Sequence, residues 1–251
     1  MKKKTLGLEV ILGAFLLTIF SSAWGYEVIK VKKGGLIKGQ VKFVGKPSPA
    51  KPPKITKDQK FCGKVPDETT IVGPGKGIKN VVVAIVNVEK GKAFDKKVTA
   101  LIDNNKCRFA PHVQAIAKGQ RIKIRNSDPL LHNTHPYLVK KPRNKTIVNL
   151  ALPIQGQVID ITRRLSRKMR KDREDIIRIK CDAHEWMLGW LHVYDHPYFA
   201  VTDKKGTFSI TNVPPGKYKV RAWHEALGQV EKDISIPASG KVSVKFKFSK
   251  K

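Results

Sequence analysis

Residues 176–187 read Ile-Ile-Arg-Ile-Lys-Cys-Asp-Ala-His-Glu-Trp-Met. The first five residues alternate between apolar and charged side chains, which indicates a strand with one buried and one solvated face. A second alternating segment, Arg121-Ile-Lys-Ile-Arg125, runs into a polar stretch that ends at His132. Two antiparallel strands that end at the same edge of a β-sandwich would bring these two loops together. Short strands separated by turn signals dominate the rest of the chain, so the sequence predicts an all-β fold.

The loop after residue 180 carries donor groups at three-residue spacing, namely Cys181, His184 and Met187. Together with His132 they offer one thiolate, two imidazoles and one thioether. Two imidazoles and a thiolate in a near-trigonal plane, with a weak axial methionine sulfur, describe a mononuclear copper site that transfers electrons. We expect Asn133 to hydrogen-bond across to the Cys181 loop and to hold the two ligand segments in register.

The upstream His-Asn pair and the downstream Cys-x-x-His-x-x-Met resemble the metal loops of the cupredoxins, the blue-copper proteins of the amicyanin and plastocyanin type. The resemblance covers residues 80–195 and implies a Greek-key β-sandwich that carries one electron at a time on copper. It also implies that His184 is the partly exposed ligand. Trp186 and Trp190 would then form an apolar contact patch beside it, although both are equally well explained as core residues.

Other ligands and other metals stay open at this point. His135 lies three residues after His132 and could replace it, and His112 is another candidate. Zinc also takes cysteine and histidine, but it does not favour methionine, and its structural sites usually have a second pair of cysteines. Met187 is one of only two methionines after residue 25, which favours copper. Without a metal, the two ligand histidines would be ordinary loop residues.

The chain has three cysteines, an odd number for a protein that we expect to be exported. If Cys181 binds a metal as a thiolate, Cys62 and Cys107 remain as one disulfide. The alternative is that Cys181 pairs with one of the other two and leaves a free thiol. No Cys-x-x-Cys-His motif is present, so the sequence carries no site for covalently attached haem.

Residues 1–25 have the pattern of a signal peptide, with three lysines, an apolar run and a small-residue cleavage site at Ala23-Trp-Gly25. The sequence therefore predicts export to the periplasm or the extracellular space. An uncleaved membrane anchor is the alternative, but the uninterrupted apolar stretch is short for a spanning helix.

The formal net charge is +30 over 251 residues. Removal of residues 1–25 takes away three lysines and one glutamate and leaves +28. A field of this size attracts anionic partners. For an exported protein we expect an acidic redox protein, for example a multihaem c-type cytochrome, or an anionic envelope surface, and no nucleic acid. Residues 163–173, inside a predicted helix at 160–174, carry seven Lys or Arg and form either a docking patch or a solvated insertion.

The segments on either side of the predicted copper domain also read as strands. Residues 196–251 resemble the carboxypeptidase regulatory-like modules, which are small transthyretin-like β-sandwiches, through Thr202-Asp-x-x-Gly-x-Phe and Val213-Pro-Pro-Gly-x-Tyr. Residues 26–79 form an N-terminal β segment with a proline-rich connector at 46–53. A strand near residues 39–49 could belong to the C-terminal module. The copper domain would then be inserted in that module, and a tandem order is the alternative.

The sequence contains no nucleophile elbow, phosphate-binding loop or zinc-peptidase motif, so we expect no enzymatic activity. The favoured function is that of an exported blue-copper electron carrier. Two alternatives remain: a structural or adhesive envelope protein in which a metal only stabilises the fold, and a copper-delivery protein with the same ligands.

Overall fold

The computed structural model describes residues 25–140, 142–169 and 174–250. Strands make up most of the regular structure in these residues, and the predicted all-β class is confirmed. The helices are short: α1 (Gln59–Cys62), α2 (Thr162–Ser166) and the 3-10 helix η1 (Pro74–Lys76). None of the helices found in this part of the chain is long and apolar enough to span a membrane. The predicted signal peptide lies outside it, apart from Gly25.

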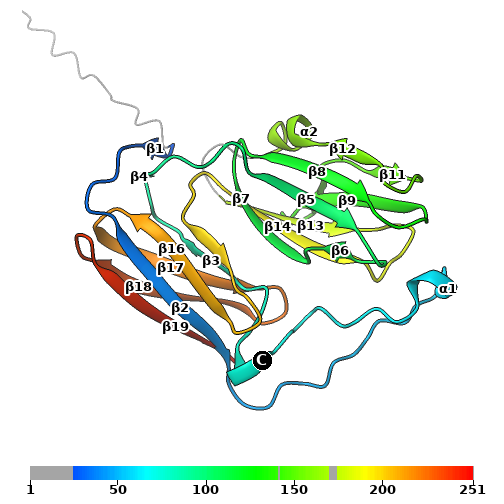
Figure 1. Cartoon of the computed structure of the whole chain (residues 1–251), viewed down its shortest axis with the longest axis horizontal. Coiled ribbons are helices and arrows are strands. Elements are labelled where there is room, and N and C mark those ends of the chain that lie inside the picture. The colour runs from blue at the N-terminus through cyan, green and yellow to red at the C-terminus, as the bar shows by residue number, and fades with distance from the viewer. Residues whose placement is uncertain (1–24, 141, 170–173, 251) are drawn as a thin grey trace, which may run out of the picture.

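Residues 99–194 form a β-sandwich that we call the site domain (Figure 1). One sheet has the order β10-β9-β13-β14-β7, with β11 also paired to β9, and the other has the order β12-β8-β5-β6. Its strands are β5 (Thr99–Asn104), β6 (Phe109–Ala110), β7 (Val113–Ala117), β8 (Arg121–Asn126), β9 (His132–Leu138), β10 (Lys145–Thr146), β11 (Leu150–Leu152), β12 (Val158–Asp160), β13 (Asp175–Lys180) and β14 (Leu188–Tyr194).

The alternating sequences fill the core of the site domain. In β13 the side chains of Ile177 and Ile179 are buried, and in β8 those of Ile122 and Ile124 are buried. Burying one such side chain stabilises the fold by roughly 1.5–3 kcal/mol. Because β13 pairs antiparallel with β9 in the same sheet, the end of β13 and the start of β9 meet at one edge. The two predicted metal loops therefore lie side by side.

The remaining strands form a second sandwich, which we call the flanking module. Its sheets have the orders β15-β3-β17-β18 and β16-β2-β19, and its core is separate from that of the site domain. Its strands come from both sides of the site domain in the chain, which is the inserted rather than the tandem order. They are β2 (Gly35–Phe43), β3 (Val82–Ile85), β15 (Phe199–Val201), β16 (Thr207–Val213), β17 (Gly216–His224), β18 (Gly228–Ile236) and β19 (Lys241–Phe248), while β1 (Glu27–Val28) pairs with β4 (Lys90–Gly91).

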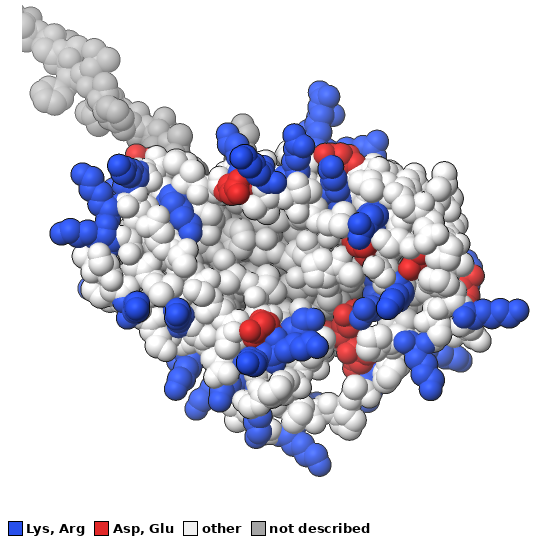
Figure 2. All heavy atoms as spheres, viewed as in Figure 1, with Lys and Arg blue, Asp and Glu red and all other residues white. Residues whose placement is uncertain are grey.

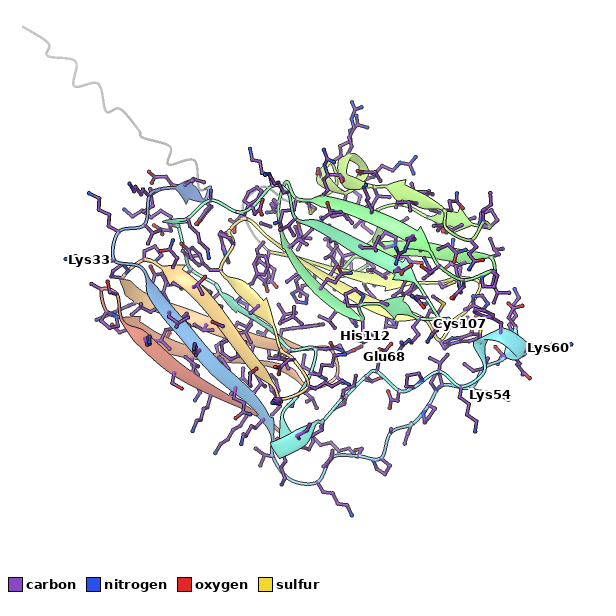
Figure 3. The ribbon with its side chains drawn as sticks, in the orientation of Figure 1. Lys33, Lys54, Lys60, Glu68, Cys107 and His112 are labelled. Carbon is purple, nitrogen blue, oxygen red and sulfur yellow. A yellow bond between two sulfur atoms is a disulfide. The ribbon has the colours of Figure 1, made fainter. Side chains whose placement is uncertain are left out.

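The two sandwiches touch through a small apolar cluster and through polar bridges. The cluster joins Val82 of β3 to Val113 and Tyr194 of the site domain, with Trp190 and Trp223 packed against it. A second set of contacts joins His112 to Glu225 and, more loosely, to Glu68 (Figure 3). The flanking module is therefore fixed to the site domain on the side of β7 and β14.

Residues 46–70, which we call the arm, leave the flanking module after β2, run along the site domain and return (Figure 1). This segment contains the predicted proline-rich connector. Helix α1 lies at its far tip, where Cys62 forms a disulfide with Cys107. The disulfide expected from the cysteine count is present, and Cys181 is free and buried.

Candidate metal centre

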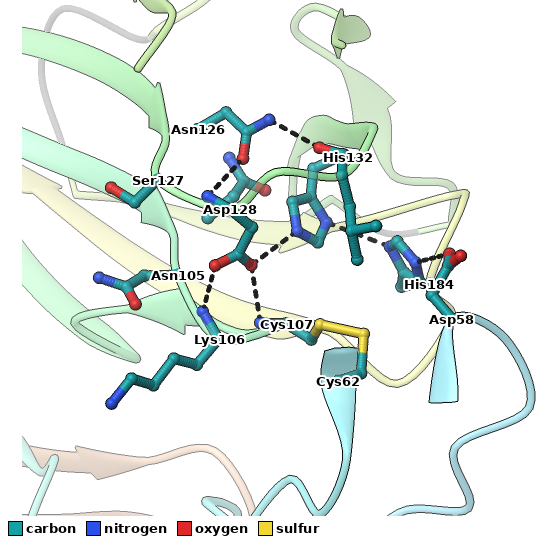
Figure 4. A network of polar contacts seen from close by, with 12 residues as sticks. Asp58, Cys62, Asn105, Lys106, Cys107, Asn126, Ser127, Asp128, His132 and His184 are labelled. Carbon is teal, nitrogen blue, oxygen red and sulfur yellow. Dashed lines mark hydrogen bonds and ion pairs between the residues drawn. A yellow bond between two sulfur atoms is a disulfide. The ribbon is translucent and has the colours of Figure 1, made fainter. Parts of the chain in front are cut away.

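Three ligand atoms, from His132, His184 and Cys181, converge where β9 begins and where the loop at residues 181–187 turns. Figure 4 shows the rings of His132 and His184 side by side. Nδ1 of His132 lies 3.1 Å from Nδ1 of His184, and Sγ of Cys181 lies 3.7 Å from that same His184 atom. Bonds of about 2.0 Å to nitrogen and about 2.3 Å to sulfur, at trigonal angles, place ligand atoms roughly 3.5–3.7 Å apart. The spacing therefore accommodates one metal ion among the three atoms.

Two carboxylates fix the tautomers of the two histidines. Nε2 of His132 lies 2.8 Å from Oδ2 of Asp128, and Nε2 of His184 lies 2.8 Å from Oδ2 of Asp58. An ionised carboxylate only accepts hydrogen bonds, so each Nε2 carries the proton and donates it. Each Nδ1 then carries a lone pair and no proton to donate. The two lone pairs therefore repel each other across 3.1 Å. A cation between them removes this repulsion.

Asp128 is itself held firmly in place. Its Oδ1 accepts the backbone N–H of Lys106 at 2.7 Å, and its Oδ2 accepts that of Cys107 at 2.9 Å. Its own N–H donates to Oδ1 of Asn126 at 3.1 Å. Hydrogen-bonded carboxylates behind ligand histidines commonly orient the ring and raise its basicity. Burial lowers the pKa of His132, and the hydrogen bond that its ring donates to Asp128 opposes that shift.

The thiol of Cys181 is buried, and burial raises its pKa, although the backbone N–H groups of Asn133, His184 and Ala183 act in the opposite direction. The N–H of Asn133 donates to Sγ at 3.3 Å. A bound cation would reverse the effect of burial, because a coordinating thiol is deprotonated by the metal charge. The expected bridge across the two loops is also formed, since Oδ1 of Asn133 accepts the N–H of Asp182 at 3.0 Å.

Met187 is 1% exposed and belongs to the same buried cluster as Cys181. Its N–H donates to the carbonyl oxygen of His184 at 2.9 Å, which closes the turn that carries all three donors of the loop. The loop therefore turns the methionine into the domain rather than into solvent.

The expectation that His184 is partly exposed is wrong, because its side chain is only 1% exposed. The reason is the arm, which places Asp58 on the Nε2 atom that would otherwise face water. The Asp58 side chain is 36% exposed, so the surface above the site belongs to the arm. Asp58 has a φ of 50°, a left-handed conformation that Asp and Asn tolerate better than most residues.

The alternative histidines lie elsewhere. Strand β9 alternates, so the ring of His135 points away from His132 and contacts Asp182 at 2.9 Å and Tyr137 at 2.7 Å. His112 lies between the carboxylates of Glu225 and Glu68, at the contact between the two sandwiches. Neither belongs to the group of converging ligand atoms found in the described residues.

The two tryptophans do not form a common patch. The ring of Trp186 lies 5.0 Å from that of His184, and its Nε1 donates to the carbonyl oxygen of Cys107 at 3.1 Å. Trp190 instead packs against Trp223 and donates to Glu225 at 2.8 Å. Trp186 therefore supports the site, and Trp190 belongs to the contact with the flanking module.

Asp128 and Asp58 are the site residues that the sequence analysis missed. Asp128 lies four residues before His132, and this spacing was an available signal. Asp58 lies 126 residues before its partner, and no local pattern connects the two. Cys107, Asp128 and His132 also lie close together, but Cys107 is already oxidised and offers no thiolate.

Residues 188–244 match the family model of polysaccharide lyase family 4, domain II. This match corrects the expected carboxypeptidase regulatory-like identity of residues 196–251, since most of these residues match a different family model. A sequence search of the curated proteins finds no match to the chain.

Among solved structures, the chain is similar to a copper-containing nitrite reductase from Thermus scotoductus SA-01, with 19% identity and a TM-score of 0.30 over 45% of this chain. It spans about a quarter of the length of that reductase. It is also similar to a purple cupredoxin from Nitrosopumilus maritimus, with 18% identity and a TM-score of 0.27, over 39% of this chain and 99% of that one. Scores this low carry no functional weight, so the chemistry of the site rests on its donor atoms.

Proposed function

We propose that the site domain is a cupredoxin-like domain that binds one copper ion and that the protein is an electron carrier rather than an enzyme. His132, Cys181, His184 and Met187 would hold the ion, and bound copper would supply a one-electron couple. One observation carries this proposal: two imidazole lone pairs and a thiol converge in a buried site while carboxylates hold the opposite ring nitrogens.

The donor set favours copper over zinc. Structural zinc sites are tetrahedral and take four cysteine, histidine or carboxylate ligands. Here three such donors converge, and the fourth candidate is a thioether, which is a soft ligand suited to copper. The two carboxylates nearest the histidines are occupied by ring Nε2 atoms, so they serve to orient ligands rather than to bind the ion.

Bound copper supplies a one-electron couple, Cu(II) to Cu(I), in which no bond is made or broken and no proton moves. The protein residues keep the site rigid and dry. His132 begins β9, Cys181 follows β13 directly, and the hydrogen bonds of Asn133 connect the two segments. Because the ligands are held by strand ends and are buried, they have little freedom to rearrange when the charge of the site changes.

The partner and the location form part of the same proposal. Residues 1–25 support export, and the charge of +30 supports an acidic redox partner, such as a multihaem c-type cytochrome. A copper-delivery protein would share the ligands, but the buried site and its covering arm favour retention of the metal over rapid exchange.

The test is the optical spectrum of the copper-loaded protein. We expect an intense visible thiolate-to-copper charge-transfer band and a reversible one-electron wave in voltammetry. Cys181→Ser removes the thiolate and should abolish the band. His135→Ala is the matched control, because that ring points away from the site, and it should keep the band. A colourless wild type, or loss of the band in the His135 variant, would rule out the proposed ligand set.

A further inference from the structure

The outer surface of the arm is strongly basic. Its exposed lysines recur at short intervals toward and beyond helix α1, at positions Lys51, Lys54, Lys57, Lys60 and Lys64. Figure 3 shows Lys60 at the tip of the arm. The acidic residues of the arm face other groups: Asp58 contacts His184, Asp67 accepts the backbone N–H groups of Lys51 and Thr69, and Glu68 contacts Arg108.

Charge alone does not single out the arm, because Lys and Arg side chains are spread over the whole face shown in Figure 2. The arm differs because its Phe61 is the only aromatic side chain classed as exposed in the part of the chain that the structure describes, whereas the other exposed large apolar side chains are aliphatic. Phe61 of α1 is 42% exposed and lies next to Cys62. Leu131 is 50% exposed and lies next to His132, and its neighbour Leu130 packs on the cluster around the Cys62–Cys107 disulfide.

An apolar centre within a charged rim is the usual anatomy of a protein interface. Exposed aromatic side chains at such centres contribute much of the binding energy. The lysines of the rim would guide an acidic partner by long-range attraction. The basic rim is complementary to an acidic partner, and one aromatic side chain inside it fits the centre of a protein interface. Anionic lipid surfaces also take up aromatic side chains next to lysines, so vesicle binding is included as an outcome of the test.

The same patch adjoins Asp58, the residue that covers the candidate ligand His184. His184 is covered by Asp58, whose backbone carbonyl oxygen accepts the N–H groups of Phe61 and Cys62 at 3.1 and 2.9 Å. A partner seated on α1 would therefore be separated from the His184 ring by one side chain of the arm. The disulfide holds this segment against the site domain, so the surface is firmly positioned.

We propose that the arm tip, formed by Lys57, Lys60, Phe61 and Lys64, is the docking surface for an acidic protein. The redox character of that partner rests on the proposed function, but the docking itself does not. In this proposal the partner docks on the arm and not on an exposed edge of His184, which the sequence predicted.

The experiment measures binding of an acidic one-electron protein, oxidised plant-type ferredoxin, to the metal-free protein by calorimetry at low and high salt. The arm variant is Lys57→Glu/Lys60→Glu/Lys64→Glu. Its control is Lys241→Glu/Lys245→Glu/Lys247→Glu, on exposed positions of β19 in the flanking module. Both variants change the net charge equally, so they separate a local surface from the overall field.

We expect the arm variant to weaken binding by about tenfold or more at low salt and to lose most of the salt dependence, whereas the control stays within about twofold of wild type. Phe61→Ala should weaken binding by about tenfold at both salt concentrations, because it removes the apolar centre without changing charge. All three variants change exposed side chains, and an unchanged circular dichroism spectrum verifies their fold.

Equal loss in the arm and β19 variants, or no binding of ferredoxin to wild type, would overturn the proposal. Binding of the wild type to phosphatidylglycerol vesicles that is lost only in the arm variant, without loss for ferredoxin, would assign the arm to a membrane surface and overturn it as well. Because the titrations use metal-free protein, they stay independent of the charge-transfer band that tests copper binding.

Discussion

The carboxylates of Asp128 and Asp58 decide which nitrogen of each histidine faces the candidate metal. Without them either ring could present a protonated nitrogen to the site, and metal binding would first require a change of tautomer. Asp128 is buried, and its carboxylate accepts the backbone N–H groups of Lys106 and Cys107. Its own backbone N–H donates to Asn126. The Asp58 side chain is 36% exposed and belongs to the arm. Asp128 therefore holds the His132 ring more rigidly than Asp58 holds the His184 ring.

Asp58→Asn should weaken copper binding by about tenfold, the low end of the range for partners of ligand histidines. The substitution keeps the size and the tolerance for positive φ but removes the charge that fixes the His184 tautomer. Competition with a chromophoric chelator measures the change. Asp67→Asn is the control on the same arm, because the hydrogen bonds of Asp67 go to Lys51 and Thr69. Equal losses in both variants would show that the effect is not transmitted through His184.

At this scale the sequence predicted the residues whose signal is local. Cys181 and His184 are three residues apart, and both follow a strand with clear alternation. Asn133 was predicted because it follows His132 directly. The cover over His184 was not predictable, because it depends on a contact between residues 58 and 184 that only the folded chain creates.

At the scale of elements, alternation located β8 and β13 well because burial on one face of a strand leaves a two-residue period. The predicted helix at 160–174 is confined to α2 at Thr162–Ser166 within the described residues. Dense positive charge stabilises neither a long helix nor a packed face. For the arm, the sequence predicts only a proline-rich connector at residues 46–53. Prolines indicate that a segment is not a central strand, but they do not indicate which surface it covers.

The Cys62–Cys107 disulfide should control how tightly the arm covers the site. For a sequence separation of 45 residues, the chain-entropy model gives a stabilisation of about 4 kcal/mol. Cys62→Ala/Cys107→Ala should therefore release the arm tip and speed copper transfer to a chelator, while the charge-transfer band changes little because Cys181 is untouched. Stopped-flow transfer rates measure this, and hydrogen exchange of residues 55–65 reports the release. An unchanged transfer rate together with increased exchange would show that the arm does not limit metal access.

For the whole molecule, the flanking module contains a buried titratable group, His224, at the end of β17 and on the same face as the core residues Val220 and Ala222. Nδ1 of His224 accepts the backbone N–H groups of Ala226 and Leu227 at 3.2 and 3.3 Å, and the residue is 2% exposed. Burial lowers the pKa of His224 to about 4, with Glu225 acting against this shift and His112 adding to it. The native protein therefore holds this ring neutral.

The protein should lose stability as the pH falls from about 6.5 to about 4. In that window His224 is protonated in the unfolded chain but not in the native one, so protons favour unfolding, and the full effect is about 3 kcal/mol. His224→Asn keeps an acceptor for the two N–H groups and removes the titration. Urea unfolding of metal-free protein at a series of pH values should show a shallower acid slope for the variant and parallel behaviour near pH 8. An identical slope in both proteins would assign acid sensitivity to other groups.

The sheet that joins β2 to β19 has a consequence for biosynthesis. Residues 35–43 pair in parallel with residues 241–248, which come much later in the chain. The two strands that pair with β2 are β16 and β19, which begin at Thr207 and Lys241, so this sheet cannot form until those residues have emerged. The inserted sandwich has its strands within residues 99–194 and can assemble sooner. We therefore expect the site domain to fold first and the flanking module to fold after it.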